Sequence, residues 1–257
     1  RRPLARARRM SIITITTMAD GVDAALAARA GPLLALMQLS DSALPIGRHA
    51  HAMGLERLLR DGRVLTAASL RDMIVSALMH SVARADGAAT ALAHDAVRAH
   101  DLQALVAVDT QLDLLKLTRP AQAASRRCGS RLASLAVWLS SNVTLAQYTA
   151  MVAARHAPGH LAVVSGAVFA AAGVSREDAV LAEMRGVAAM ILSAAVRLDI
   201  VAAAASQELL AGLTPEIIAA AGIALRTGHD EMECSAAAGL EIAAMRHARD
   251  DARLFAT

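Results

Sequence analysis

The chain has 257 residues, of which 56% are hydrophobic and only 2% are aromatic. Its formal net charge is +3, but five arginines lie within the first nine residues, and the remainder of the chain carries −2. This balance excludes a broad nucleic-acid-binding surface, and a composition led by Ala and Leu favours helices over strands. We therefore predict an all-α fold, a single domain of about ten antiparallel helices.

Residues 1–30 are expected to form a disordered or artefactual N-terminal extension, and the helical domain to span 31–257. The first helix of that domain ends between Asp41 and Gly47, because Pro45 cannot continue a helical hydrogen-bond ladder. Further helices are predicted from 50–53 to 60, then at 66–82, 88–99, 101–117, 120–139, 144–154, 161–172, from 175 past 196, from 214, and at 230–246.

Several helix boundaries are marked by capping residues. Thr66 and Ser175 are typical N-caps, and Pro215 occupies a first-turn position where its missing N–H costs nothing. Gly173 is a plausible C-cap, and Asp86-Gly87 is predicted to separate two helices.

The mean hydropathy of +0.43 makes a membrane protein worth considering. The two longest uncharged stretches, 132–154 and 156–175, are interrupted by polar residues or by Pro158-Gly159. Neither provides the ~20 predominantly apolar residues of a spanning helix. Cys128 and Cys234 lie far apart and form no disulfide framework, so we predict a cytoplasmic protein without membrane contact.

Common catalytic signatures are absent from the sequence. It contains no GxxxxGK[ST], GxGxxG, HExxH or GxSxG motif. His156 and His160 have helical spacing, but Pro158-Gly159 lies between them and disfavours a shared helix face. A metal-binding helical enzyme that uses His49, His51 and Glu56 as ligands or general bases remains an alternative.

The most specific polar stretch is LSDSALPIGRHAHAMGLE, residues 39–56. A helix–loop–helix corner accounts for part of it, because Asp41 can bond free backbone donors and Pro45 and Gly47 can set a turn. Gly54 would permit close approach of two helices. Such a corner does not explain why the stretch also carries Glu56 and a basic cluster. Its distinctive polar and glycine residues are Asp41, Ser42, Gly47, Arg48, His49, His51, Gly54 and Glu56.

This stretch resembles the N-terminal signature of the UreF family of urease accessory proteins, L-x-x-S/A-D-S-x-L-P-x-G-x-x-x-H-S/A-x-G-x-E. The matching residues are Asp41, Ser42, Leu44, Pro45, Gly47, His51, Gly54 and Glu56. A second stretch, GHLAVVSGAVFAAAGVS at 159–175, is similar to the family's H-x-x-V-V-x-G segment, with matches at His160, Val163, Val164, Gly166 and Gly173. The C-terminal MRHARDDARLFAT is similar to the family's tail, with matches at Met245, His247, Arg253, Leu254 and Phe255. The departures from the family pattern are Arg48, His49, Ala248 and Ala252.

The resemblance implies a non-catalytic helical protein that forms a homodimer, binds UreD (also called UreH) and recruits the GTPase UreG. Together these proteins load nickel and a carbamylating carbon dioxide into apo-urease, so nickel and GTP are handled by the complex and no cofactor is expected on this chain. Two hypotheses place the contacts. The 41–56 corner engages the GTPase, with His51 and Glu56 as polar contacts, and a flexible tail docks on UreD through Arg253, Leu254 and Phe255.

Overall fold

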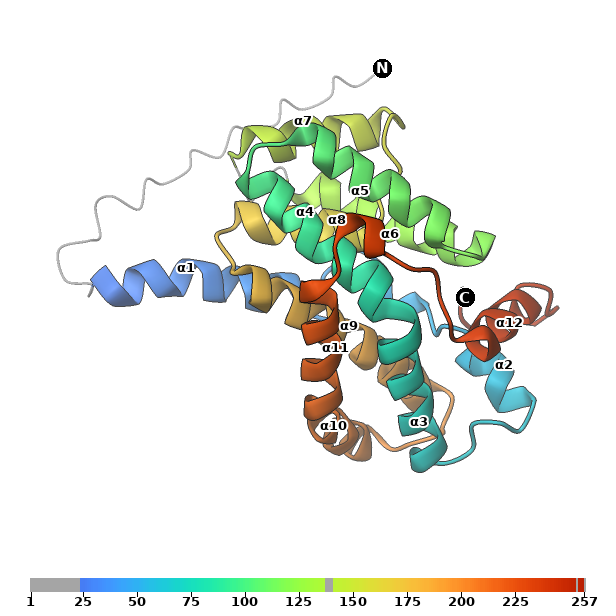
Figure 1. Ribbon diagram of the computed structural model, residues 1–257. Helices are drawn as coiled ribbons and strands as arrows, with labels where there is room; N and C mark the ends of the chain where they lie inside the picture. The colour runs from blue at the N-terminus through green and yellow to red at the C-terminus, as the bar shows by residue number, and fades with distance from the viewer. Residues whose placement is uncertain (1–23, 137–140, 253, 257) are drawn as a thin grey trace, which may run out of the picture.

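The computed structural model describes residues 24–136, 141–252 and 254–256, and every regular element in these ranges is helical (Figure 1). The all-α prediction is confirmed. The α-helices are α1 (Ala24–Leu39), α2 (Leu55–Arg60), α3 (Ala67–Ala77), α4 (Ala88–Arg98), α5 (Leu102–Leu115), α6 (Arg119–Ala136), α7 (Val143–Ala153), α8 (Leu161–Ala171), α9 (Arg176–Arg197), α10 (Ala203–Gly212), α11 (Thr214–Arg226) and α12 (Ala238–His247). Two 3₁₀ turns, η2 (Arg48–Ala50) and η4 (His229–Glu231), and a π-helical segment, η3 (Leu78–Gly87), complete the order.

The predicted caps are present. The Thr66 hydroxyl accepts a hydrogen bond from the backbone N–H of Ser69, which completes a capping box at the start of α3. Ser175 accepts from the N–H of Asp178 at the start of α9, and Gly173 ends the preceding helix with φ +79°. These boundaries follow from local sequence because each cap bonds to a residue only three positions away.

The predicted break at Asp86-Gly87 is wrong. Gly87 keeps right-handed helical angles, and α3 continues through η3 into α4 without interruption. A Cβ at Gly87 would lie 2.7 Å from the Cβ of Ala224, so the glycine permits close packing against α11. The Asp86 carboxylate accepts from Lys116 Nζ at 2.8 and 3.0 Å, which explains this residue by a long-range contact as well.

The last predicted helix begins later than expected. Instead of starting at residue 230, the chain passes through η4 and then runs along η3 before α12 begins at Ala238. Backbone N–H groups of Glu233 and Ala236 donate to the carbonyls of Arg84 and His80, at 3.3 and 2.7 Å. A π-helical turn changes which backbone carbonyls accept hydrogen bonds within the helix. The segment before α12 donates to two carbonyls of η3.

One further boundary and one further helix differ from expectation. Helix α1 already begins at Ala24, so the N-terminal extension predicted for 1–30 overlaps a helix in its last part, and residues 1–23 lie outside the described ranges. Helix α10 was not predicted; Ala202, its N-cap residue, makes no side-chain capping bond that would mark a start. The end predicted for the 120–139 helix also falls beyond the described residues, since α6 is described to Ala136.

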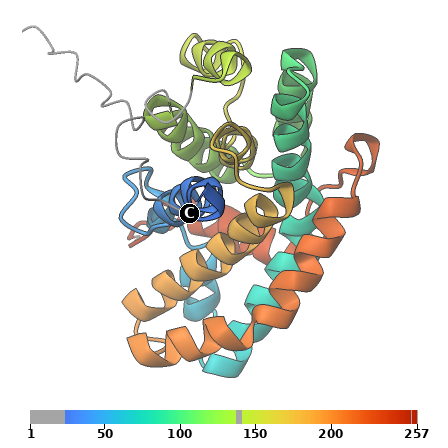
Figure 2. The same cartoon turned by 90° about the vertical axis from the view of Figure 1, so that its left-hand side faces the viewer.

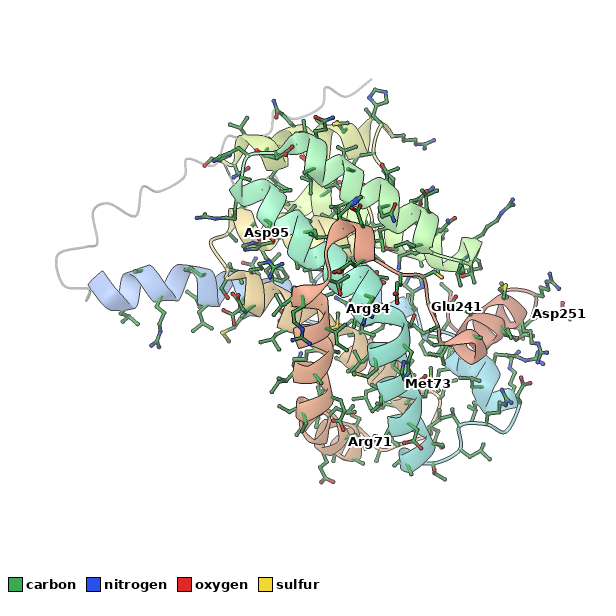
Figure 3. All side chains as sticks on the ribbon, viewed as in Figure 1. Arg71, Met73, Arg84, Asp95, Glu241 and Asp251 are labelled. Atoms are coloured by element: carbon green, nitrogen blue, oxygen red, sulfur yellow. The ribbon has the colours of Figure 1, made fainter. Side chains whose placement is uncertain are left out.

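Two large apolar clusters form most of the interior, one around α4, α5, α6, α7 and α8 and the other around α2, α3, α9, α11 and α12. The continuous α3–η3–α4 helix contributes to both (Figure 1). A small third cluster joins the end of α1 to α8 and α9. Ion pairs link elements at the periphery, as between Arg71 on α3 and Glu216 on α11, near the lower end of the bundle in Figure 3.

One described helix, α9, is long and apolar enough to cross a bilayer, and α10 with α11 would pass the same test only as a bent pair. The most apolar window of α9 is 61% buried inside the bundle, so packing accounts for its hydropathy. Helix α1 behaves differently: it extends away from the body in Figure 1 and is seen nearly end-on in Figure 2. Leu34 and Met37 on α1 are each 63% exposed.

Candidate partner-binding site

The corner between α1 and α2 is a tight loop, and its backbone conformation requires glycine at two positions. Asp41 accepts from the N–H of Ala43 at 2.8 Å, and Gly47 and Gly54 adopt φ of +82° and +77°. A Cβ at Gly54 would lie 2.8 Å from the backbone nitrogen of Ala244 on α12. The expected role of Gly54 in close helix approach is therefore confirmed.

Glu56 lies in the first turn of α2 and is only 5% exposed. Its Oε2 accepts from the backbone N–H groups of Leu254 and Phe255 at 3.0 and 3.1 Å, and its Oε1 accepts from Arg60 at 2.7 Å. Nε2 of His247, a fully buried ring, lies 3.2 Å from the Phe255 carbonyl oxygen. We call these five residues, Glu56, Arg60, His247, Leu254 and Phe255, the tail clamp.

Around the tail clamp, further ion pairs connect α2 to the end of α12. Asp250 pairs with Arg57 at 3.0 Å and with Arg60 at 3.1 Å, and Arg57 also pairs with Asp61 at 2.9 Å. Asp251 lies at the outer edge of this region, beyond α12 in Figure 3. The tail is thus held by a connected charge network rather than by one contact.

Phe255 is 3% exposed and belongs to the apolar cluster of α9. The Arg197 guanidinium lies over its ring, 4.4 Å from the centroid, and also donates to the carbonyl of His49. The N–H of Ala256 donates to the Ala50 carbonyl at 2.9 Å. The tail predicted to be flexible is therefore packed between the corner and α9, because an aromatic side chain and its backbone both find partners there.

Two of the predicted contact residues, Glu56 and Phe255, lie inside the chain. Glu56 is buried and already bonded within the chain, so it positions the tail instead of presenting a free carboxylate to a partner. Phe255 likewise faces inward, whereas Leu254 beside it is 61% exposed. Arg253 lies outside the described residues.

Arg48, one of the departures from the family pattern, has its own partner inside the chain. It pairs with Glu183 on α9 at 2.8 and 3.0 Å, where the two side chains are 16% and 4% exposed. A Cβ at Gly186 would lie 2.7 Å from the Arg48 guanidinium, so this glycine makes the room. Helix α9 thus accommodates Arg48 with the Glu183 carboxylate and with the space left by Gly186.

The two corner histidines are poor candidates for a cation site. Burial lowers the pKa of His51 to about 4, with help from Arg127 and Arg131, and burial, Arg48 and Arg197 lower the pKa of His49. Both rings are therefore neutral at pH 7, but the surrounding guanidinium charge opposes a divalent ion. Within the described ranges no three His, Cys, Asp or Glu side chains could hold a metal together.

Beside the corner lies a cleft of about 640 Å³ bounded by α1, α9 and α10. Asp41 and Ser42 stand exposed on its rim, and Pro45 is exposed on the same loop. The far wall carries Ser206 and Gln207 from α10. These exposed corner residues, unlike Glu56, are accessible to another protein.

Some residues of this site have no motif of their own. Arg60 could have been found from the sequence, since it follows Glu56 by four positions on a helix and such pairs attract. Glu183 and Arg197 could not, because they approach the corner only through the packing of α9.

Comparison with known proteins points to one family. The UreF family model matches residues 64–214. The chain is 28% identical over 225 residues to the urease accessory protein UreF of Actinobacillus pleuropneumoniae, covering 88% of this chain and 99% of that protein. It is 30% identical over 230 residues to UreF of Arthrobacter sp. (strain FB24), with 90% and 99% covered. Identity to UreF 2 of Brucella abortus (strain 2308) is 32% over 223 residues, with 87% and 91% covered.

The matched spans are long, and the three relatives are all named as urease accessory proteins. This chain belongs to the UreF family of urease accessory proteins and is a non-catalytic member of the urease maturation machinery.

Proposed function

We propose that this chain is a cytoplasmic scaffold and regulator that works with UreD (UreH) and the GTPase UreG to promote nickel insertion into apo-urease. In this proposal nickel is cargo of the complex, GTP is bound by UreG, and the chain acts as a homodimer. The observation that carries the proposal is the tail clamp. Glu56 in the corner motif holds Leu254 and Phe255 of the tail motif, so two segments distant in sequence form one unit.

Each part of that unit has an accessible surface. The corner exposes Asp41, Ser42 and Pro45 beside the cleft, which we assign to the GTPase. His51, Gly47 and Gly54 lie beneath and keep the loop in shape. The tail exposes Leu254, which together with Arg253 we assign to UreD. Phe255 anchors the tail so that Leu254 is held outward.

The proposal is tested by reconstitution of apo-urease with UreD, UreG, nickel, bicarbonate and GTP, with and without this chain. We expect urease activity to require the chain. We also expect Glu56→Gln to reduce activation and capture of UreD, at a temperature where circular dichroism shows the variant folded. The matched control is Glu177→Gln, an exposed residue in the first turn of α9. Equal activation without the chain contradicts the proposal.

A further inference from the structure

A second concave surface, of about 730 Å³, lies between α6 and the end of α7. It is lined by four arginines and a histidine, with small residues between them. We call Arg126, Arg127, Arg131, Arg155 and His156 the arginine pocket. All five side chains are exposed. Three of the arginines come from one face of α6, and Arg155 and His156 come from the loop after α7.

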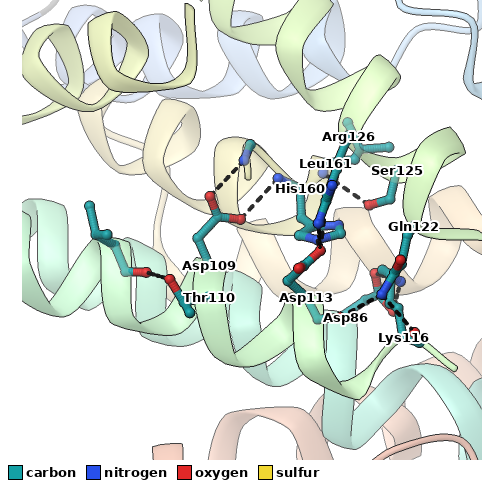
Figure 4. A network of polar contacts seen from close by, with 12 residues as sticks. Asp86, Asp109, Thr110, Asp113, Lys116, Gln122, Ser125, Arg126, His160 and Leu161 are labelled. Carbon is teal, nitrogen blue, oxygen red and sulfur yellow. Dashed lines mark hydrogen bonds and ion pairs between the residues drawn. The ribbon is translucent and has the colours of Figure 1, made fainter. Parts of the chain in front are cut away.

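The charge of the arginine pocket is largely uncompensated. Arg126 alone pairs with a carboxylate, that of Asp113, to which His160 also bonds at 2.8 Å (Figure 4). Arg131 bonds to the Ile46 carbonyl at 3.4 Å. In the described part of the chain, no carboxylate pairs with Arg127, Arg131 or Arg155, and none lines the pocket.

The loop between α7 and α8 is held at its C-terminal end by buried hydrogen bonds to α5. Asp109 is fully buried and accepts from the Tyr148 hydroxyl at 2.8 Å and from the N–H groups of Gly159 and His160 at 2.6 and 2.9 Å. Figure 4 shows Asp109 and His160 of this network, and the two backbone bonds hold the end of the loop that follows Arg155 and His156. A concavity lined by charges of one sign raises the local concentration of ions of the opposite sign.

The positive charge also reaches the corner. Arg127 and Arg131 both contribute to the low pKa of His51, after burial. Arg131 lines the pocket and also binds the turn at Ile46, where Gly47 leaves the space that its guanidinium occupies. A ligand in the arginine pocket would therefore contact a side chain that supports the corner.

The chemistry of the pocket selects its occupant. Guanidinium groups bind carboxylates in a planar, bidentate manner, and cations spread over two elements match several carboxylates better than one small ion. No Phe, Tyr or Trp lines the pocket, so nucleic-acid bases would find only the single His156 ring to stack on. We propose that the arginine pocket is a docking site for an acidic, Asp- and Glu-rich protein segment of a maturation partner. This inference rests on the proposed function and adds a third contact surface to it.

The direct test uses the full chain and a fluorescein-labelled twelve-residue peptide of alternating Glu and Ala, with the Gln-for-Glu peptide as the uncharged probe. We expect the acidic peptide alone to bind, more weakly as salt rises. Arg127→Gln with Arg155→Gln should raise its Kd about tenfold or more. The matched control, Arg63→Gln with Arg98→Gln, removes the same charge from exposed arginines outside the pocket and should change Kd less than about twofold.

The remaining outcomes each overturn the inference. They are no binding of the acidic peptide, equal weakening in the pocket variant and the control, stronger binding of an oligothymidylate of twelve nucleotides, and full displacement of the peptide by inorganic phosphate at an equal concentration. The assay contains no other maturation protein. If peptide binding fails while apo-urease activation still requires the chain, the inference falls and the proposed function stands.

Discussion

The tail clamp and the arginine pocket both concentrate charge, but they use it in opposite ways. In the clamp and the ion pairs around it, Glu56 and Asp250 each have basic or N–H partners inside the chain. In the pocket, Arg127 and Arg155 have no carboxylate partner within the described ranges. Buried charges must be paired because desolvation is costly, whereas exposed charges need no partner to be stable. Paired charge thus specifies this fold, and unpaired charge is available for binding.

The largest effect on stability should come from the buried pair of Arg48 and Glu183. Arg48→Met leaves the 4% exposed Glu183 carboxylate without its cation, which should lower the free energy of unfolding by about 3–4 kcal/mol. Urea denaturation measures this loss. Arg185→Met, at an exposed position two residues from Glu183 in sequence, should change stability by less than about 0.5 kcal/mol. Equal effects of the two substitutions would show that the pair does not specify the fold.

Phe255→Ala should lower the free energy of unfolding by about 3 kcal/mol, because it removes a buried ring and its contact with Arg197. Leu254→Ala, the adjacent exposed residue, should change it by less than about 0.5 kcal/mol while weakening capture of UreD. If Phe255→Ala leaves thermal unfolding unchanged, the tail is not part of the packed core.

Stability should depend on pH through His51. Its folded pKa of about 4 lies below the value of 6.5 of an unperturbed histidine, so between these values the unfolded chain binds the proton that the folded chain does not. Stability is therefore full above pH 6.5 and falls by about 2 kcal/mol as pH drops to 4, after allowance for solvent screening. The slope of unfolding free energy against pH should be smaller in His51→Gln. An identical slope in this variant contradicts the lowered pKa.

The smallest effect on stability should come from the arginine pocket. Arg127→Gln with Arg155→Gln removes exposed charges that make no ion pair in the described ranges, so the free energy of unfolding should change by less than about 0.5 kcal/mol. Thermal melts at low and high salt measure it. A loss of more than about 2 kcal/mol would show that these arginines stabilise the fold, and the contrast between the two regions would disappear.

The parts of this structure that depend on neighbouring residues could be predicted from sequence. Thr66, Ser175 and Gly173 set helix boundaries through contacts three or four positions away. The prediction of a break at Asp86-Gly87 was wrong because Gly87 packs against α11 and Asp86 binds Lys116. No local sequence pattern reveals these long-range contacts.

In the site, the resemblance to a family singled out Glu56 and Phe255 but did not reveal that they bind each other's segment inside the chain. Their meeting depends on how α12 returns to α2, across almost two hundred positions of sequence. The inward orientation of Phe255 follows from the position of Arg197, and the pairing of Arg48 follows from α9. Sequence reasoning could name these side chains, whereas only the packed bundle shows which are buried.

Amide hydrogen exchange at Leu254 and Phe255 tests most directly whether Glu56 joins the corner and the tail. In the wild-type chain we predict that both amides exchange at least about a hundredfold more slowly than in an unstructured peptide, and that Glu56→Gln removes most of this protection while the amides of α8 remain protected. Exchange at unstructured rates in the wild-type chain, or protection unchanged in Glu56→Gln, would contradict the account.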